Sequence, residues 1–127
     1  MRAGAQIGRN VMIGRFASID EDVVIGDGSR VQEGARLFCG CQVGKGVFIG
    51  PEAVICNHRH PCVRQPGEVF EPQSVVIEDG ANIGANATLV PPIVVGAGAT
   101  VGAGSVVVRD VPAGVTVVGN PAVILKG

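Results

Sequence analysis

The sequence predicts an all-β fold, a parallel β-helix built from six-residue repeats. Three observations support this prediction: aliphatic residues recur every six positions, a small or medium-sized side chain usually follows them four positions later, and 20 of the 127 residues are glycine. Glycine at this density without the three-residue period of collagen indicates another kind of repeat. The helical period of 3.6 residues is absent, so we expect almost no α-helix before the C-terminus.

The aliphatic positions form two series with the same spacing, and all fifteen are Ile, Val or Leu. Because alternate side chains of a strand point to opposite faces, each position marks a short strand with its large side chain inside. The positions are Ile7, Ile13, Ile19, Ile25, Val31, Leu37, Val43, Ile49 and Ile55, then Ile77, Ile83, Leu89, Val95, Val101 and Val107.

Glycine often follows the aliphatic residue directly, as at Gly26 and Gly84, and small residues such as Ala35 and Ala87 come four positions after it. We attribute the glycines to backbone angles that other residues avoid, and the small side chains to a crowded corner. Each six-residue unit is therefore one short strand plus a bend.

The two series are interrupted by segment 57–74, which contains four prolines or glycines and both histidines, His58 and His60. Ile55 and Ile77 are 22 residues apart, four more than three repeats. A polar, proline-containing segment of this length inside a compact repeat is usually functional or disordered. We expect a loop that leaves one edge of the β-helix.

Composition excludes several classes of function. A net charge of −1 and a pI of about 6.1 give no electrostatic reason to bind nucleic acid or an anionic membrane. No apolar run approaches the ~18 residues that span a bilayer, so we expect no membrane insertion. The N-terminus lacks a charged region followed by an apolar stretch, so we expect no signal peptide and a cytoplasmic location.

Four cysteines are present, and a reducing compartment favours free thiols over disulfides. The spacing of Cys39 and Cys41 does not fit a zinc site, so we expect no metal there. We expect both to be small buried side chains, as free cysteine often is.

The repeat of an aliphatic residue, glycine, two variable residues, a small residue and a variable one resembles that of the hexapeptide-repeat acyltransferases. The resemblance implies a left-handed β-helix shaped as a triangular prism, with three repeats per coil and about five coils. It implies one domain over 1–127, with 113–127 as a C-terminal cap. It also implies a homotrimer, a closed assembly, with active sites between neighbouring prisms.

Within this family, the chain is most similar to the N-acetyltransferases that act on nucleotide-linked 3-amino sugars. The similarity covers nearly the whole chain, and its most specific part is segment 47–57 followed by His60-Pro61. Segment 80–89 also matches, and the matching terminal segments 101–107, 110–112 and 119–122 are shared more widely in the family.

The resemblance implies that acetyl-CoA is the donor and that Asn57 holds the attacking amine. Placing the two substrates side by side removes much of the entropic barrier. A neutral amine is already a nucleophile, so no strong base is needed, and an Asn carbonyl can accept one amine hydrogen and orient the lone pair. Direct attack on the thioester is therefore the predicted mechanism.

His60 supports an alternative, because sugar O-acetyltransferases of the same superfamily carry a catalytic His before a Pro at this spacing. A hydroxyl needs a general base, and the pKa of histidine suits that task. A non-catalytic β-helix that serves assembly is a third hypothesis. A γ-class carbonic anhydrase needs three histidine zinc ligands per site, and the chain has two histidines.

We expect acetyl-CoA to lie along the C-terminal half of the prism. Glycine and alanine there would let pantetheine approach backbone amides closely, although turn formation alone also explains them. Basic residues near the C-terminal end are predicted to bind the CoA phosphates. The predicted contacts are Gly84, Ala85, Gly102 and Ala103 for pantetheine, and Arg109 and Lys126 for the phosphates.

The chain differs from this branch in two places. Only Phe16 remains of an aromatic stretch that members often carry in the second coil, and Cys62 follows His60-Pro61 where Arg is common. We expect Arg36 and Arg64 to compensate by binding the sugar-nucleotide diphosphate. His58 is predicted to be a further loop contact to this substrate.

Overall fold

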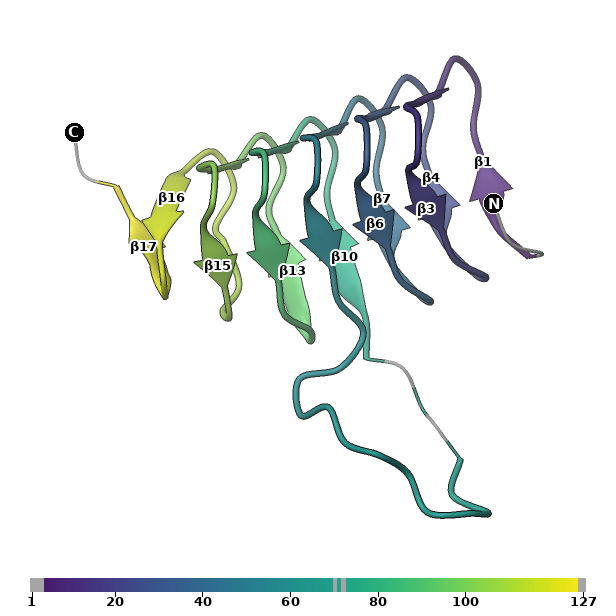
Figure 1. The fold of residues 1–127 in the computed structure, drawn as a ribbon. Coiled ribbons are helices and arrows are strands. Elements are labelled where there is room, and N and C mark those ends of the chain that lie inside the picture. The colour runs from purple at the N-terminus through teal and green to yellow at the C-terminus, as the bar shows by residue number, and fades with distance from the viewer. Residues whose placement is uncertain (1–3, 70, 72, 126–127) are drawn as a thin grey trace.

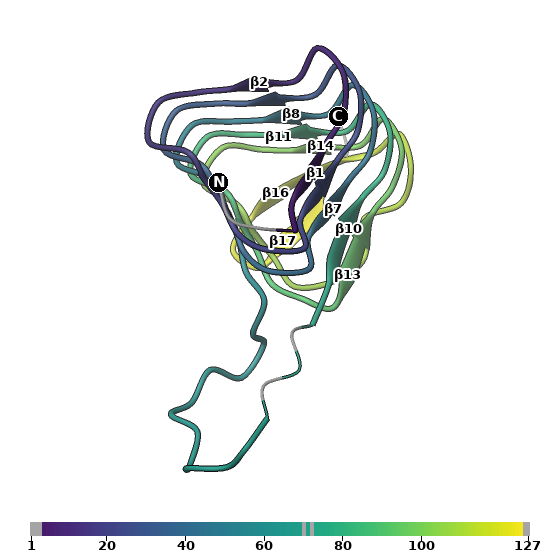
Figure 2. The same ribbon diagram turned by 90° about the vertical axis from the view of Figure 1, so that its right-hand side faces the viewer.

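The chain folds as the predicted left-handed parallel β-helix, seen in a computed structural model that describes residues 4–69, 71 and 73–125 (Figure 1). Those residues form seventeen short strands and no helix. The strands build three sheets that form the flat sides of a triangular prism when viewed along its axis (Figure 2). None of the described residues belongs to a helix long and apolar enough for a membrane crossing.

The first fifteen strands are distributed in turn over the three sheets, and the last two extend the second sheet. The first sheet contains β1 (Gln6–Ile7), β4 (Val24–Ile25), β7 (Gln42–Val43), β10 (Val75–Ile77) and β13 (Ile93–Val95). The second contains β2 (Met12–Ile13), β5 (Arg30–Val31), β8 (Phe48–Ile49), β11 (Asn82–Ile83), β14 (Thr100–Val101), β16 (Thr116–Gly119) and β17 (Ala122–Ile124). The third contains β3 (Ser18–Ile19), β6 (Arg36–Leu37), β9 (Val54–Ile55), β12 (Thr88–Leu89) and β15 (Val106–Val107).

Apart from the terminal strand β17, neighbouring strands in a sheet are parallel and belong to successive coils. Ile83, for example, lies between Ile49 of the preceding coil and Val101 of the following one. From β1 to β15 the paired residues of uninterrupted coils are 18 apart, as Ile7 and Ile25 are, and the last coil is two residues shorter, with Val101 paired with Val117. Three six-residue repeats therefore make one coil, as predicted.

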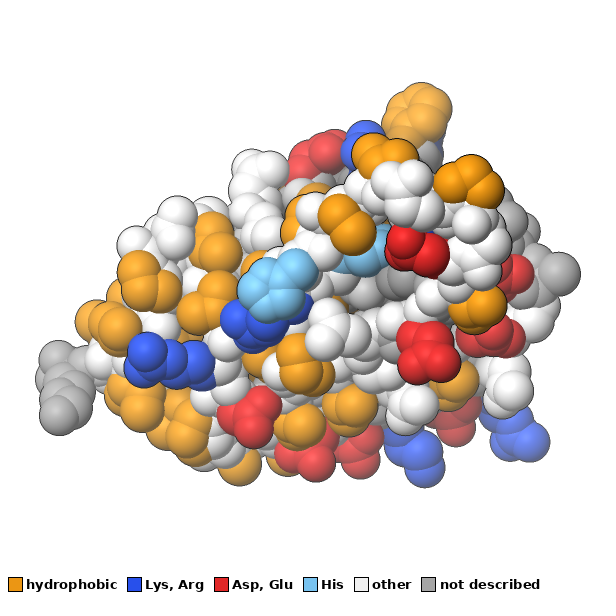
Figure 3. All heavy atoms as spheres, turned by 90° about the horizontal axis from the view of Figure 1, so that it is seen from below, with side chains coloured by type: hydrophobic (Ala, Val, Ile, Leu, Met, Phe, Trp, Pro, Cys, Tyr) orange, Lys and Arg blue, Asp and Glu red, His pale blue; other side chains and the backbone are white. Residues whose placement is uncertain are grey.

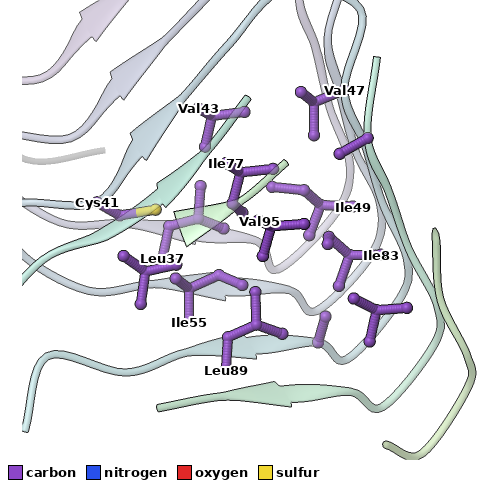
Figure 4. Packing of buried hydrophobic residues seen from close by; sticks show 14 of the residues in the cluster. Leu37, Cys41, Val43, Val47, Ile49, Ile55, Ile77, Ile83, Leu89 and Val95 are labelled. Carbon is purple, nitrogen blue, oxygen red and sulfur yellow. The ribbon is translucent and has the colours of Figure 1, made fainter. Parts of the chain in front are cut away.

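The inward columns form the core (Figure 4). Leu37, Ile55 and Leu89 of the third sheet lie one above another, and each is at most 1% exposed. The prediction of inward aliphatic side chains holds from Ile19 onward. In the first coil Ile13 is 38% exposed, because no earlier coil covers it.

The glycines that directly follow the aliphatic residues have a different role from the one predicted. The left-handed backbone conformation occurs two residues later, for example at Gly28 (φ +73°). At Gly84 an added Cβ would lie 2.6 Å from the backbone nitrogen of Ala103 in the next coil. Close stacking of coils, rather than unusual backbone angles, requires glycine there.

Two of the three corners of the prism carry a continuous series of backbone hydrogen bonds. At the corner between the first and second sheets, Gly98 N donates to Asp79 O at 3.0 Å. At the corner between the second and third sheets, called the glycine corner here, Gly104 N donates to Ala85 O at 2.8 Å. Each bond joins one coil to the next.

The interruption lies at the third corner, between the third and first sheets, which we call the loop corner. β9 ends at Ile55 and β10 begins at Val75, and the chain between them leaves the prism (Figures 1 and 2). Val43 pairs with Ile77, 34 residues away instead of 18, so sixteen extra residues leave the stacking of the coils unchanged. At the C-terminal end, β16 and β17 form an antiparallel hairpin.

Replacing Ile83 by Ala should destabilise the fold by about 2–5 kcal/mol, because the side chain is fully buried between two coils and its removal leaves a cavity. Urea unfolding measures the loss. Val94→Ala is the matched control, since Val94 points outward and is 38% exposed, and it should cost less than about 1 kcal/mol. Equal losses in the two variants would contradict the inward columns.

Candidate active site

The two ends of the loop are joined where they leave the prism. Cys56 N still donates to Leu89 O of the next coil at 3.0 Å, and the chain departs after it. Gln73 N donates to Asn57 O at 3.2 Å, and the Gln73 side chain accepts from Arg59 N at 3.0 Å. Asn57 therefore lies at a fixed point, where the regular coil changes into loop.

Four of the predicted site residues line one hollow of about 240 Å³ on this loop: Asn57, His58, His60 and Arg64. Figure 3 shows the face from which the loop projects, with the histidines between basic and acidic side chains. The acidic residues of the hollow, Glu68 and Glu71, were not singled out by the sequence analysis. Carboxylates in a loop have no periodic pattern, so only the fold could place them beside the histidines.

Asn57 and His58 contact each other, with His58 Nδ1 3.1 Å from Asn57 Oδ1. Because Oδ1 is an acceptor, the contact is a hydrogen bond when Nδ1 carries the proton, which leaves Nε2 as the acceptor of the ring. His58 is half-buried, whereas His60 is exposed. The structure thus links Asn57 to His58, a pairing that the sequence did not indicate.

The predicted pantetheine contacts lie elsewhere on the prism. Gly84, Ala85, Gly102 and Ala103 belong to the glycine corner, between β11 and β12 and between β14 and β15. The third sheet separates this corner from the loop corner within one chain. The structure therefore does not bring these residues together with Asn57 in a single copy.

Stacking accounts for two of these glycines by itself. An added Cβ at Gly84 would meet backbone of the next coil, and one at Gly102 would lie 2.7 Å from Val118 Cγ1. The structure therefore explains these two glycines without pantetheine, because a larger residue would collide with the next coil. Ala103 is exposed and Ala85 is half-buried, so this corner still offers a surface of small side chains.

The predicted cations are dispersed. Arg109 lies at the loop corner two coils beyond Asn57, beside a cavity of about 410 Å³ whose lining includes Val111 and Ile124. Arg36 lies on the outer surface of the third sheet, where it pairs with Ser18 and Val54. Lys126 lies outside the described residues.

The cysteines differ in burial. Cys41 is 1% exposed as predicted, and burial raises the pKa of its thiol to about 12. The prediction that Cys39 is buried is wrong: it occupies the loop corner, not an inward position, and is half-buried. Burial also raises the pKa of the Cys56 thiol, beside Asn57, whereas Cys62 is exposed on the loop.

In the part of the chain that the structure describes, no group of three or more His, Cys, Asp or Glu side chains could hold a metal ion. The hollow is lined by amide, imidazole, guanidinium, carboxylate and thiol groups.

Two protein-family profiles match the chain on either side of the loop. The profile for bacterial transferase hexapeptide, with six repeats, matches residues 4–39, and the profile for the hexapeptide repeat of succinyl-transferase matches residues 74–109. The two stretches together make up more than half of the chain. The chain belongs to the hexapeptide-repeat acyltransferase family.

Solved structures with this family's fold superpose on nearly the whole chain. A hexapeptide-repeat acetyltransferase from Vibrio cholerae, complexed with acetyl-CoA, is 28% identical with a TM-score of 0.82, covering 97% of this chain and 70% of that one. The acetyltransferase domain of PglB from Neisseria gonorrhoeae, also with acetyl-CoA, is 30% identical with a TM-score of 0.83, covering 98% and 53%. A GDP-perosamine N-acetyltransferase variant from Caulobacter crescentus, with CoA and GDP-perosamine, is 27% identical with a TM-score of 0.74, covering 100% and 56%.

The curated relatives of this family member are longer proteins. The bifunctional protein GlmU of Carboxydothermus hydrogenoformans is 40% identical over 112 residues, which cover 88% of this chain and 23% of GlmU. The chain thus spans about a quarter of the length of the curated relatives that it matches.

Alkylation with iodoacetamide at pH 8 should label Cys62 first and Cys41 only after unfolding. The thiolate is the reactive form, and Cys41 is both inaccessible and, with a pKa of about 12, protonated at this pH. Peptide mass spectrometry over time measures the order, and a urea-unfolded sample is the control in which all four sites react. Labelling of Cys41 in the folded protein as fast as Cys62 would contradict the placement of the two residues.

Proposed function

We propose that the chain transfers the acetyl group of acetyl-CoA to the amino group of a nucleotide-linked amino sugar, by direct attack of the amine on the thioester. The observation that carries this proposal is the position of Asn57, held at the base of the loop with its side chain in the hollow and bonded to His58. The likeness to solved acetyltransferases with bound acetyl-CoA supports the donor.

The charges of the hollow suit an acceptor that carries both an amine and phosphates. Glu68 and Glu71 would attract an ammonium group, while Arg64 would bind an anionic oxygen. The likeness to the GDP-perosamine N-acetyltransferase supports an acceptor of this class. Arg36, on the third sheet, would extend the anion site beyond the hollow.

Asn57 would orient the neutral amine by accepting one of its hydrogens. As the C–N bond forms and the C–S bond breaks, the amine loses a proton and CoA leaves as a thiolate, which takes that proton directly or through water. His58 Nε2 is the ring acceptor that remains when Nδ1–H bonds Asn57, so His58 would contact the sugar beside the amine.

An O-acetyltransferase with His60 as general base is the second candidate. His60 lines the same hollow and is exposed, so a hydroxyl of an acceptor could reach its ring. A hydroxyl is a weaker nucleophile than a neutral amine and needs this base, so the two candidates assign the loss of activity to different residues.

We further propose that the active unit is a homotrimer. The loop corner and the glycine corner lie on opposite sides of the third sheet, so the acceptor residues of one prism meet the proposed pantetheine residues only on a neighbouring copy. Cyclic symmetry closes such contacts without free interfaces. A cytoplasmic location, which fits four free thiols, is part of the same proposal.

Asn57→Ala should lower acetyl transfer to an amino-sugar nucleotide by about 100-fold, whereas His60→Ala should lower it by less than about 5-fold. Release of CoA thiol from acetyl-CoA, measured with a panel of amino-sugar nucleotides and hydroxyl sugars, reports the rate. Asn82→Ala, on the outer surface of the second sheet, is the matched control. If only His60→Ala loses activity, and only with a hydroxyl acceptor, the result would contradict N-acetylation and favour O-acetylation.

Light scattering should give a mass about three times the 12.9 kDa of one chain. Asn57→Ala and Ala103→Trp should each have low activity alone, because the first alters the acceptor site at the loop corner and the second alters the donor site at the glycine corner. Refolding the two variants together should restore activity. In a mixed trimer, some interfaces join an unaltered loop corner of one copy to an unaltered glycine corner of another. A monomeric active protein, or mixtures without restored activity, would contradict a site shared between copies.

A further inference from the structure

Arg59 reaches from the base of the loop across the two following coils. Its Nε donates to the carbonyl oxygen of Pro91 at 2.9 Å, and its Nη2 donates to the carbonyl oxygen of Val108 at 2.7 Å. Successive coils lie about 4.8 Å apart, so the side chain runs along the loop corner, parallel to the axis of the prism. The planar guanidinium presents donors in a fixed fork, which allows one group to bind both carbonyls.

The contact with Pro91 joins two coils through a side chain instead of through a backbone hydrogen bond. Pro91 is the second residue after the inward Leu89, the same position that Asp79 and Ala85 hold after their inward residues. At those two corners the carbonyl accepts from a backbone N–H of the next coil. At Pro91, on the loop corner, the donor is the Arg59 side chain of the preceding coil, so a residue of the loop joins the coils at the corner that lacks the backbone series.

The backbone of Arg59 is held as well. Arg59 N donates to Gln73 Oε1 at 3.0 Å, and Gln73 N donates to Asn57 O at 3.2 Å. Segment 57–60 is therefore attached to the returning end of the loop on one side and to the C-terminal coils on the other. Arg59 is half-buried, in contrast to the exposed residues 60–69 that follow it.

We propose that Arg59 is a positioning residue of the acetyl-transfer site. It fixes the backbone that carries Asn57, His58 and His60 against the two following coils, and it acts through these neighbours instead of through the substrate. The proposal rests on the proposed function for its effect on catalysis. The attachment of the loop base is a separate claim with its own measurement.

Arg59→Met keeps most of the length of the side chain and removes its donors. We expect kcat to fall by about 10- to 100-fold, because a displacement of about 1 Å of reacting groups costs this much, while KM for acetyl-CoA changes by less than about 3-fold. Arg59→Lys, which can donate to one carbonyl, should recover part of kcat. Arg9→Met, an exposed arginine on another corner, is the matched control and should leave both constants unchanged.

Backbone amide exchange measures the attachment itself. In Arg59→Met the amides of residue 59 and Gln73 should exchange at least about 10-fold faster than in Arg9→Met, while amides of the buried strands remain protected. If Arg59→Met does not fold, Arg59→Lys carries the same comparison, with smaller changes of the same sign.

Unchanged exchange at the loop base, or an unchanged kcat in an active enzyme, would overturn the positioning role. A rise in KM for acetyl-CoA with kcat retained would also overturn it, because Arg59 would then bind the donor directly. If the unmodified protein transfers acetyl to no acceptor, the proposed function fails, and amide exchange still decides whether Arg59 attaches the loop.

Discussion

The stacking of each coil on the next is the interaction on which the rest of the structure depends. Parallel strands pair across neighbouring coils, and the inward side chains contact their equivalents in those coils. Because most contacts join neighbouring coils, stability is nearly a sum over adjacent interfaces. The polar inward side chains are satisfied within the same arrangement, since Ser29 Oγ donates to Gly44 O at 2.7 Å and accepts from Val47 N at 3.0 Å.

Regular stacking turns each corner of the prism into a straight edge, and the edges differ in what they present. In the C-terminal coils the glycine corner carries small residues, because a Cβ at Gly84 or Gly102 would meet atoms of the next coil. The loop corner is where the chain can leave and return without disturbing β7, β10 and β13. The polar side chains of the hollow lie at this corner, and the third sheet separates them from the glycine corner. This separation is the reason for proposing that a second copy completes the transfer site.

The period of six was enough to predict the strands, the inward columns and the interruption, because inward direction follows directly from spacing. It could not predict why Gly84 is glycine, since the steric constraint comes from Ala103 in the next coil. It also missed the contact between Asn57 and His58 and the reach of Arg59 to Val108, 49 residues away. Such contacts depend on how corners align, and no local pattern records that alignment.

Calorimetric titration of the folded protein with acetyl-CoA tests the central claim most directly, because donor binding is what separates a transferase from a β-helix that only serves assembly. The account predicts saturable binding of one acetyl-CoA per chain, with a Kd in the range of about 1 μM to 1 mM that is usual for enzyme substrates. Absence of binding at millimolar acetyl-CoA, in protein whose buried amides remain protected, would contradict it.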